Sequence, residues 1–255
     1  MRIDINCDMG ESFGHYRIGA DEEMMRYITS ANIACGFHAG DPLVMARTVA
    51  SAVKHGVGIG AHPGYLDLRG FGRRRVDLPA EEIEADVLYQ IGALDAFARA
   101  SGTRVTHVKA HGALYNASEV DPKVATAIAR AVRRYDPNLV IVCLATSRVA
   151  VEAAQAEGLR VAREAFADRN YNADGTLRSR REPDAVIKDP ALAAERAVRM
   201  ARDGVIVAYD GTEVPVRADT LCIHGDEPTA PAVAQAVRSA LAAAGVAITG
   251  LAERV

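Results

Sequence analysis

Two hydrophobic periods alternate along the chain and predict strands and helices in turn. Short apolar runs, typical of buried strands, lie near 2–7, 32–37, 57–62, 105–110, 139–144, 160–166 and 220–224. Amphipathic or alanine-rich segments, typical of helices, lie near 21–30, 41–55, 80–101, 121–135, 147–157, 189–203 and 229–244. Strand and helix alternate seven times. Such alternation predicts right-handed crossovers and a parallel sheet.

Three predicted helices carry the same start signal. Asp-Pro pairs begin at Asp41, Asp121 and Asp189. The aspartate is a favoured N-cap residue, and proline is favoured at the first helical position. These pairs therefore support helix starts near residues 41, 121 and 189.

Polar side chains gather on one face of several predicted strands. In the first run Asp4, Asn6 and Asp8 share a face, and in the fourth Lys109 and His111 share one. A solvated antiparallel sheet also alternates, but its outer face rarely collects His, Asp, Asn and Lys. An open sheet covered by helices has mostly apolar strands, whereas a barrel can point one face at a central cavity. We therefore expect an α/β fold, a distorted seven-stranded (β/α) barrel of the TIM type.

The whole chain, residues 1–255, is expected to form this single barrel domain. A hairpin near 205–218 interrupts the alternation, because two β-rich runs flank Asp210-Gly211, a favoured two-residue turn. Two irregular stretches, 62–75 and 168–189, follow strand ends, where barrel enzymes place their active-site loops. We expect these two stretches to act as lids or ligand loops.

Composition argues against several classes of partner. The chain carries 30 basic and 33 acidic residues, a net charge of −3, so no strong field favours nucleic acid or an anionic membrane. The four cysteines lie in apolar runs without a CxxC spacing, which favours buried thiols in a reducing compartment. The first strand leaves no room for a signal peptide, and no run reaches membrane-spanning length. A cytoplasmic protein that binds small molecules is expected.

Five of the seven histidines lie where an apolar run ends and a loop begins. They are His38, His62, His107, His111 and His224. Barrel enzymes carry their catalytic groups at the carboxyl ends of the strands. The placement therefore predicts one shared site in a concave cavity.

Lys109 and His111 are two residues apart on one strand, so they would project side by side into the cavity. A fixed cation beside a group that titrates near neutrality suits the stabilisation of an oxyanion or phosphoryl charge while a proton moves. The alternative is structural, because Asp4, Asp8 or Glu164 could satisfy the lysine in a buried network.

A metal site is a second possibility at the same strand ends. Asp8, His38 and His62 could ligate a divalent ion, although histidines that are hydrogen-bonded within a polar pocket are the simpler explanation. Lys109 in the same cavity would repel such an ion. We therefore expect no metal ligands among these residues and no tightly bound transition metal.

Nucleotide-binding motifs are absent from the sequence, which has neither a GxxxxGK[ST] loop nor a GxGxxG turn. Candidate phosphate ligands are two groups of loop arginines, although such groups are more often solvated or in contact with partners. They are Arg73, Arg74, Arg75, Arg178, Arg180 and Arg181.

Six stretches combine glycine, histidine, acidic and arginine residues in a specific way. They are DINCDMGESFG (4–14), TSANIACGFHAGDP (29–42), GAHPGYLDLRGFGRR (60–74), HVKAHGALYN (107–116), REAFADRNYNADGTLRSRREP (163–183) and CIHGD (222–226). Together they resemble the LamB/YcsF family nearly end to end. The resemblance implies a barrel like that of glycoside hydrolases and carbohydrate deacetylases. It also implies the A component of a 5-oxoprolinase, which works with subunits B and C.

The reaction implied by the resemblance opens 5-oxo-L-proline to L-glutamate while ATP becomes ADP and phosphate. ATP is therefore the expected cofactor, with Mg²⁺ as its counter-ion only, and nucleotide binding can be shared with the partner subunits. The expected catalytic residues are Asp8, His62, Lys109, His111 and Glu164. The expected substrate-binding residues are Asn6, Asn32, His38, Arg169, His224 and Asp226. Arg73 and Arg74 are expected to bind the nucleotide.

Two other functions stay open on the sequence alone. One is a metal-dependent deacetylase or related hydrolase, which would hold an ion at Asp8, His38 and His62. The other is a non-catalytic regulatory subunit, in which substitutions in the cavity would leave the activity of the complex intact.

Overall fold

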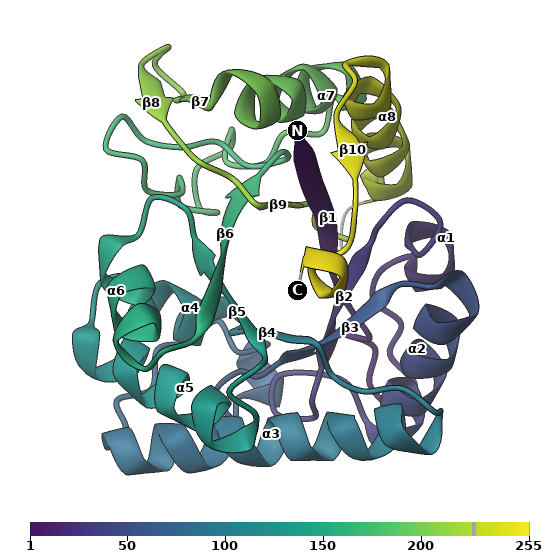
Figure 1. Cartoon of the computed structure of the whole chain (residues 1–255), viewed down its shortest axis with the longest axis vertical. Coiled ribbons are helices and arrows are strands. Elements are labelled where there is room, and N and C mark those ends of the chain that lie inside the picture. Colours follow the sequence, from purple (N-terminus) through teal and green to yellow (C-terminus); the bar gives the residue numbers. More distant parts are fainter. Residues whose placement is uncertain (226–227, 255) are drawn as a thin grey trace.

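Parallel strands close into a barrel in the computed structural model, which describes residues 1–225 and 228–254 (Figure 1). The seven barrel strands of this described chain are β1 (Arg2–Met9), β2 (Ser30–Ala34), β3 (Gly58–His62), β4 (His107–Lys109), β5 (Val140–Leu144), β6 (Arg160–Phe166) and β9 (Thr220–Cys222). Strand β9 pairs with both β6 and β1, which closes the barrel. The short strand β10 (Ala247–Ile248) pairs with the beginning of β1. The expected distorted seven-stranded barrel is confirmed.

Helices surround the barrel on its outer side (Figure 1). They are α1 (Asp21–Met24), α2 (Pro42–His55), α3 (Ala80–Ala100), α4 (Gly112–Ser118), α5 (Pro122–Tyr135), α6 (Arg148–Ala156), α7 (Pro190–Val198) and α8 (Ala230–Ala243). The side chains of Asp41, Asp121 and Asp189 accept hydrogen bonds from backbone N–H groups in the first turns of α2, α5 and α7. The three expected helix starts are therefore correct to within one residue.

Three elements, α1, β2 and α4, differ from the sequence-based expectation. The helix expected near 21–30 ends at Met24, because the chain is already paired with β1 at Thr29, whose N–H donates to Ile5 O. Strand β2 accordingly begins at Ser30 rather than near residue 32. Helix α4 was not expected, since seven residues hold too few turns for a clear hydrophobic period.

The antiparallel pair β7 (Val205–Val207) and β8 (Glu213–Pro215) lies where a hairpin was expected. A π-helical segment, Arg199–Asp203, joins α7 to this hairpin. Short 3-10 helices cover Leu68–Gly70 and Leu251–Arg254. None of the helices in the described chain has both the length and the apolar character needed to span a bilayer.

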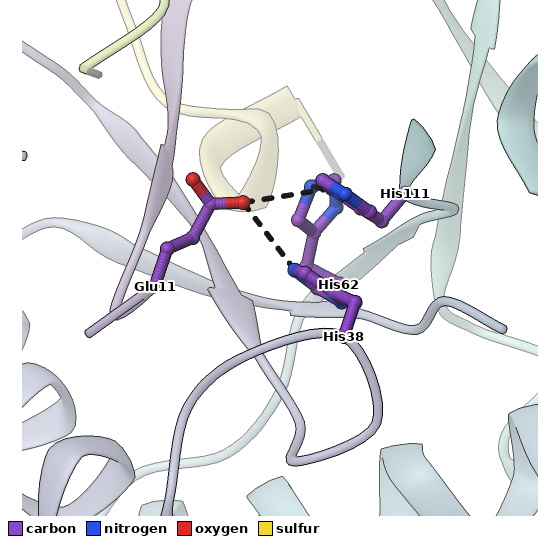
Figure 2. Close-up of side chains that lie close together, drawn as sticks. All are labelled: Glu11, His38, His62 and His111. Carbon is purple, nitrogen blue, oxygen red and sulfur yellow. Dashed lines mark hydrogen bonds and ion pairs between the residues drawn. The ribbon is translucent and has the colours of Figure 1, made fainter. Parts of the chain in front are cut away.

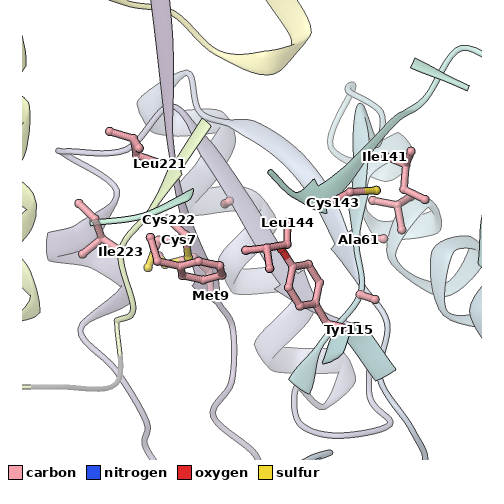
Figure 3. Close-up of a cluster of buried hydrophobic side chains, with 14 of the residues drawn as sticks. Cys7, Met9, Ala61, Tyr115, Ile141, Cys143, Leu144, Leu221, Cys222 and Ile223 are labelled. Atoms are coloured by element: carbon pink, nitrogen blue, oxygen red, sulfur yellow. The ribbon is translucent and has the colours of Figure 1, made fainter. Parts of the chain in front are cut away.

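The apolar face of the strands packs against the helices. Ile3, Ile5 and Cys7 of β1 are at most 1% exposed and belong to one continuous core. Figure 3 shows side chains of β1, β5 and β9 in this core. Each large aliphatic side chain buried in this way contributes roughly 1.5–3 kcal/mol to folding. All four cysteines are buried and free, as the sequence predicts.

Candidate active site at the mouth of the barrel

A cavity of about 620 Å³ opens at the carboxyl ends of the strands. This volume lies in the range of small-molecule sites. Asp8 reaches the cavity from β1, His62 from β3 and Lys109 from β4, while His111 and His224 follow β4 and β9. The prediction that these five side chains converge on one cavity at the strand ends is therefore correct.

Below the cavity lies a closed layer of polar side chains, here called the floor: Asp4, Asn6, Ser30, Asn32, His107 and Thr220. Each of them is fully buried. Asn32 Nδ2 donates to Asn6 Oδ1 (2.8 Å) and also to Asp8 Oδ1 (2.9 Å). The floor thereby holds Asp8 from beneath. Asn6 and Asn32, expected to bind substrate, belong to this layer and do not line the cavity.

Lys109 lies between two carboxylates. Its Nζ is 2.9 Å from Asp8 Oδ1 and 2.8 Å from Glu164 Oε1, and the side chain is only 3% exposed. Burial disfavours the ammonium group, but the charges of Asp8 and Glu164 raise the pKa of Lys109 well above its usual range. Tyr115 Oη donates to the other oxygen of Glu164 (2.8 Å). The lysine is thus charged and held in a network, and it also lines the cavity.

Asp8 connects this lysine to the histidines. Its second oxygen, Oδ2, is 3.3 Å from His62 Nε2. Burial opposes ionisation, but His62 and Lys109 hold the pKa of Asp8 well below its usual range. Asp8 therefore carries a negative charge between the lysine and the histidine.

Three histidines and Glu11 form a cluster at one side of the cavity, here called the histidine cluster (Figure 2). His38 and His111 stack with ring centroids 3.6 Å apart, and His62 stands at right angles to both. Glu11 Oε1 is 3.3 Å from His38 Nε2 and 3.5 Å from His111 Nδ1. Burial and neighbouring histidines lower the pKa of both His38 and His111 well below the usual range. These two imidazoles are therefore neutral at physiological pH.

Backbone carbonyl groups fix the orientation of two of these rings. His62 Nδ1–H donates to Lys109 O (2.7 Å), and His111 Nε2–H donates to Phe71 O (2.9 Å). A loop glycine makes the second contact possible, since a Cβ at Gly72 would lie 2.8 Å from the His111 ring. The loop near 62–75 therefore packs directly on the histidine cluster.

His224 in the cavity wall is oriented by an acidic partner, Asp168. Its Nδ1 is 3.0 Å from Asp168 Oδ2, and its backbone N–H donates to the same oxygen (2.8 Å). Its ring stacks on Phe166. These contacts fix the orientation of the His224 ring, with Nδ1 toward the Asp168 carboxylate.

Glu119 is a further acid in the cavity wall, in addition to Asp8 and Glu11. Its Oε1 has no hydrogen-bond partner among the residues that the structure describes. Burial, followed by the charge of Glu164, raises the pKa of Glu119 from 4.5 to about 8. The group is mostly protonated at neutral pH and can donate a hydrogen bond or a proton.

The arginines expected near phosphate lie in different environments. Arg73 lines the cavity. Arg74 instead forms an ion pair with Asp67 and is not part of the cavity wall. Arg169 lines the cavity, but its guanidinium donates to the carbonyl oxygens of Ala185 and Arg178 and so holds the long loop near 168–189 in place.

Sequence reasoning brought several of these residues to one cavity but assigned no role to Glu11, Asp168 or Glu119. His38 lies behind His111 rather than in the cavity wall, and Asp226 falls outside the described residues. Neither Glu11 in the histidine cluster nor Asp168 beside His224 was assigned a role. Glu11 and Asp168 each lie two residues beyond the end of a strand, so strand parity did not place either side chain.

Known proteins match this chain over nearly its whole length. The A component of 5-oxoprolinase from Heliobacterium modesticaldum is 56% identical over 254 residues and covers 100% of both chains. Its counterpart from Bacillus subtilis is 50% identical, with 99% of this chain and 98% of the relative covered. The crystal structure of the lactam utilization protein from Thermus thermophilus is 51% identical and superposes with a TM-score of 0.93, covering 98% of this chain and 100% of that one.

A more distant solved structure shares the fold alone. A variant of the peptidoglycan deacetylase PdaC from Bacillus subtilis is 11% identical and reaches a TM-score of 0.50, covering 98% of this chain and 89% of that one. At the level of the family the match is specific, since the LamB/YcsF model aligns with residues 3–255. The chain belongs to the LamB/YcsF family.

Proposed function

We propose that this chain is the A component of a 5-oxoprolinase, which opens the lactam of 5-oxo-L-proline to L-glutamate while ATP becomes ADP and phosphate. Relatives named as this component of 5-oxoprolinase, at 50–57% identity along the chain, support the assignment. The single structural observation that carries it is Lys109, a charged lysine held between Asp8 and Glu164 in the wall of the cavity.

The chemistry explains why such a site is useful. A five-membered lactam is a stable amide, and transfer of the γ-phosphoryl group to its carbonyl oxygen makes an imidate that water can attack. One water molecule opens the ring as the ring nitrogen takes a proton, and a second releases phosphate. Lys109 stabilises charge on the carbonyl oxygen and the phosphoryl group, while His224 accepts a proton from water.

Phosphate contacts come from the loops in this proposal. Arg73 provides one guanidinium at the cavity wall, and the loop near 168–189 brings Arg180 and Arg181 to the same cavity. ATP enters with Mg²⁺, which neutralises its phosphates. Subunits B and C complete the nucleotide site, since the chain itself has no GxxxxGK[ST] loop.

The test is the release of glutamate and phosphate from 5-oxoproline by this chain with subunits B and C. We expect equal amounts of both products, and we expect Lys109→Met to lower turnover by about 10³-fold or more. The matched control is Lys54→Met, an exposed position on α2. Phosphate release without glutamate, or full activity of Lys109→Met in the complex, would reduce the chain to a regulatory role.

A further inference from the structure

In the histidine cluster, the rings of His62 and His111 each point a nitrogen atom toward the other ring. A carbonyl oxygen only accepts hydrogen bonds, so the hydrogens of His62 and His111 lie on Nδ1 and Nε2, which face Lys109 O and Phe71 O. With one hydrogen on each ring, His62 Nε2 and His111 Nδ1 are left as acceptors. These two nitrogen atoms are only 3.0 Å apart. Two lone pairs at this distance repel each other unless a cation binds both.

Carboxylate oxygens add further acceptors at the same point. Glu11 Oε1 is 3.5 Å from His111 Nδ1, and Asp8 Oδ2 is 3.3 Å from His62 Nε2. One atom each from Glu11, His38, His62 and His111 falls within 4.8 Å of all the others. The side chains therefore converge as electron-pair donors, which is the arrangement that a cation needs.

We propose that His62 Nε2, His111 Nδ1 and Glu11 Oε1 bind a divalent transition metal ion of the zinc class, with a fourth position open to the cavity. Bonds of about 2.0–2.1 Å in a tetrahedral site place ligand atoms roughly 3.3 Å apart. The observed spacings of 3.0 and 3.5 Å bracket that value. Three protein ligands with one open position are typical of catalytic zinc sites rather than structural ones.

The surroundings of the two rings fit this role. Histidine ligands usually donate their other ring N–H to a carbonyl or carboxylate oxygen, which fixes the tautomer and aims the lone pair. His62 and His111 both do so. Glu11, His62 and His111 also line the cavity, so an ion at this point would be reached by a small ligand.

His38 belongs to the cluster but not to the ligand set. An imidazole lone pair lies in the plane of its ring, and the His38 ring is parallel to that of His111 with an interplanar angle of 3°. The two rings therefore cannot aim at one ion without a rotation. His38 is also outside the cavity wall, so it supports the ligand His111 by stacking.

The charge of Lys109 is the sequence-based reason to expect no transition metal here. In the structure this charge is matched by two carboxylates, Asp8 and Glu164. Asp8 also stands between the lysine and His62, with one oxygen toward each. The repulsion is therefore screened at the position of the ion, and it does not oppose binding by this ligand set.

Metal uptake by the full chain tests the proposal without any substrate, so its outcome is independent of the proposed lactam cleavage. Tag-free protein is freed of metal with a chelator, dialysed, and titrated with Zn²⁺ and with Co²⁺ in a calorimeter. We expect one equivalent of each ion, and visible absorption from Co²⁺ in a four-coordinate site. His62→Gln and His111→Gln should each weaken binding by about 100-fold or more.

Two controls separate the cluster from other histidines. His55→Gln, at an exposed position on α2, and His38→Gln should both retain the ion, and circular dichroism checks that every variant is folded. No uptake by the wild-type chain would overturn the proposal, and a proton shared by His62 and His111 would then be the cation. Equal affinity in the wild type, His62→Gln and His111→Gln would overturn it as well, because the ion would bind elsewhere.

Discussion

The floor and the mouth of the barrel are both built from buried polar side chains, but they match donors and acceptors differently. At the floor each group donates to the next, in the order His107, Asn32, Asn6, Thr220 and Asp4. This series of hydrogen bonds ends at the Asp4 carboxylate, which also accepts a hydrogen bond from Ser30 Oγ (2.7 Å). Burial and the nearby Lys109 charge lower the pKa of His107 to about 3, so its role as a neutral donor is stable.

The mouth has the opposite character. His62 Nε2 and His111 Nδ1 face each other at 3.0 Å, while the other nitrogen of each ring donates to a carbonyl oxygen. His38 Nδ1 and Glu119 Oε1 have no hydrogen-bond partner among the described residues. A satisfied polar network makes a unique and rigid interior, whereas unsatisfied buried groups cost free energy unless a ligand completes them. The comparison teaches that stability depends on the floor and that ligand binding depends on the mouth.

The largest effect on stability is expected at the floor, from Gly60→Ala. A Cβ at residue 60 would lie 2.1 Å from His107 Nε2, so the ring would have to move and lose its bond to Asn32. We expect a loss of about 5 kcal/mol or more in the free energy of unfolding, which is the scale of the whole stability of a domain. Urea denaturation measures it. Gly92→Ala on α3 is the control, since a Cβ there meets nothing within 4 Å. Equal urea denaturation midpoints for Gly60→Ala and Gly92→Ala would show that the floor tolerates a Cβ at residue 60.

A smaller loss of stability is expected at the mouth, from Lys109→Met. The methionine keeps the bulk of the side chain but leaves Asp8 and Glu164 buried without their cation, which costs about 3–5 kcal/mol. The double variant Lys109→Met/Glu164→Gln removes one of these charges and should recover most of the loss. Lactam cleavage should not recover. If the double variant is no more stable than the single one, the ion pairs do not explain the loss.

The smallest effect is expected from Glu119→Gln, and it depends on pH. A carboxyl group whose pKa is raised from 4.5 to about 8 keeps its proton in the folded state after the unfolded chain has lost it. The free energy of unfolding therefore falls as pH rises from about 4.5 to 8. Glutamine cannot ionise. Over this pH range the variant should therefore lose less of its free energy of unfolding than the wild type does, by a few kcal/mol at most. Glu81→Gln, exposed on α3, should leave the slope unchanged.

The barrel could be predicted because its signals are local. Strand alternation sorts Asp4, Asn6 and Asp8 onto one face whatever the rest of the chain does, and a closed barrel alone gives such a face a place to point. The same geometry aimed Lys109 and His111 into the cavity. It could not separate floor from mouth, because depth along the barrel axis depends on strand register. Asn6 was therefore expected at the substrate, although it lies one layer below.

Residues on loops could not be placed in this way. Glu11 follows the end of β1 at Met9, so no strand parity tells where its side chain points. Arg73 and Arg74 are neighbours in the sequence, yet one lines the cavity and the other pairs with Asp67. Their difference depends on how the loop folds back on itself, which is a tertiary property.

Strand β4 has three residues, and each serves a different layer of the molecule. His107 completes the floor, Val108 packs in the outer core, and Lys109 reaches the mouth. A slip of one residue in its pairing with β3 and β5 would turn Val108 inward and both polar side chains toward the helices. A barrel that closes with the correct strand pairing therefore also assembles the site correctly. The cavity is formed during folding itself, so Lys109 and the histidines are already in place in the folded molecule.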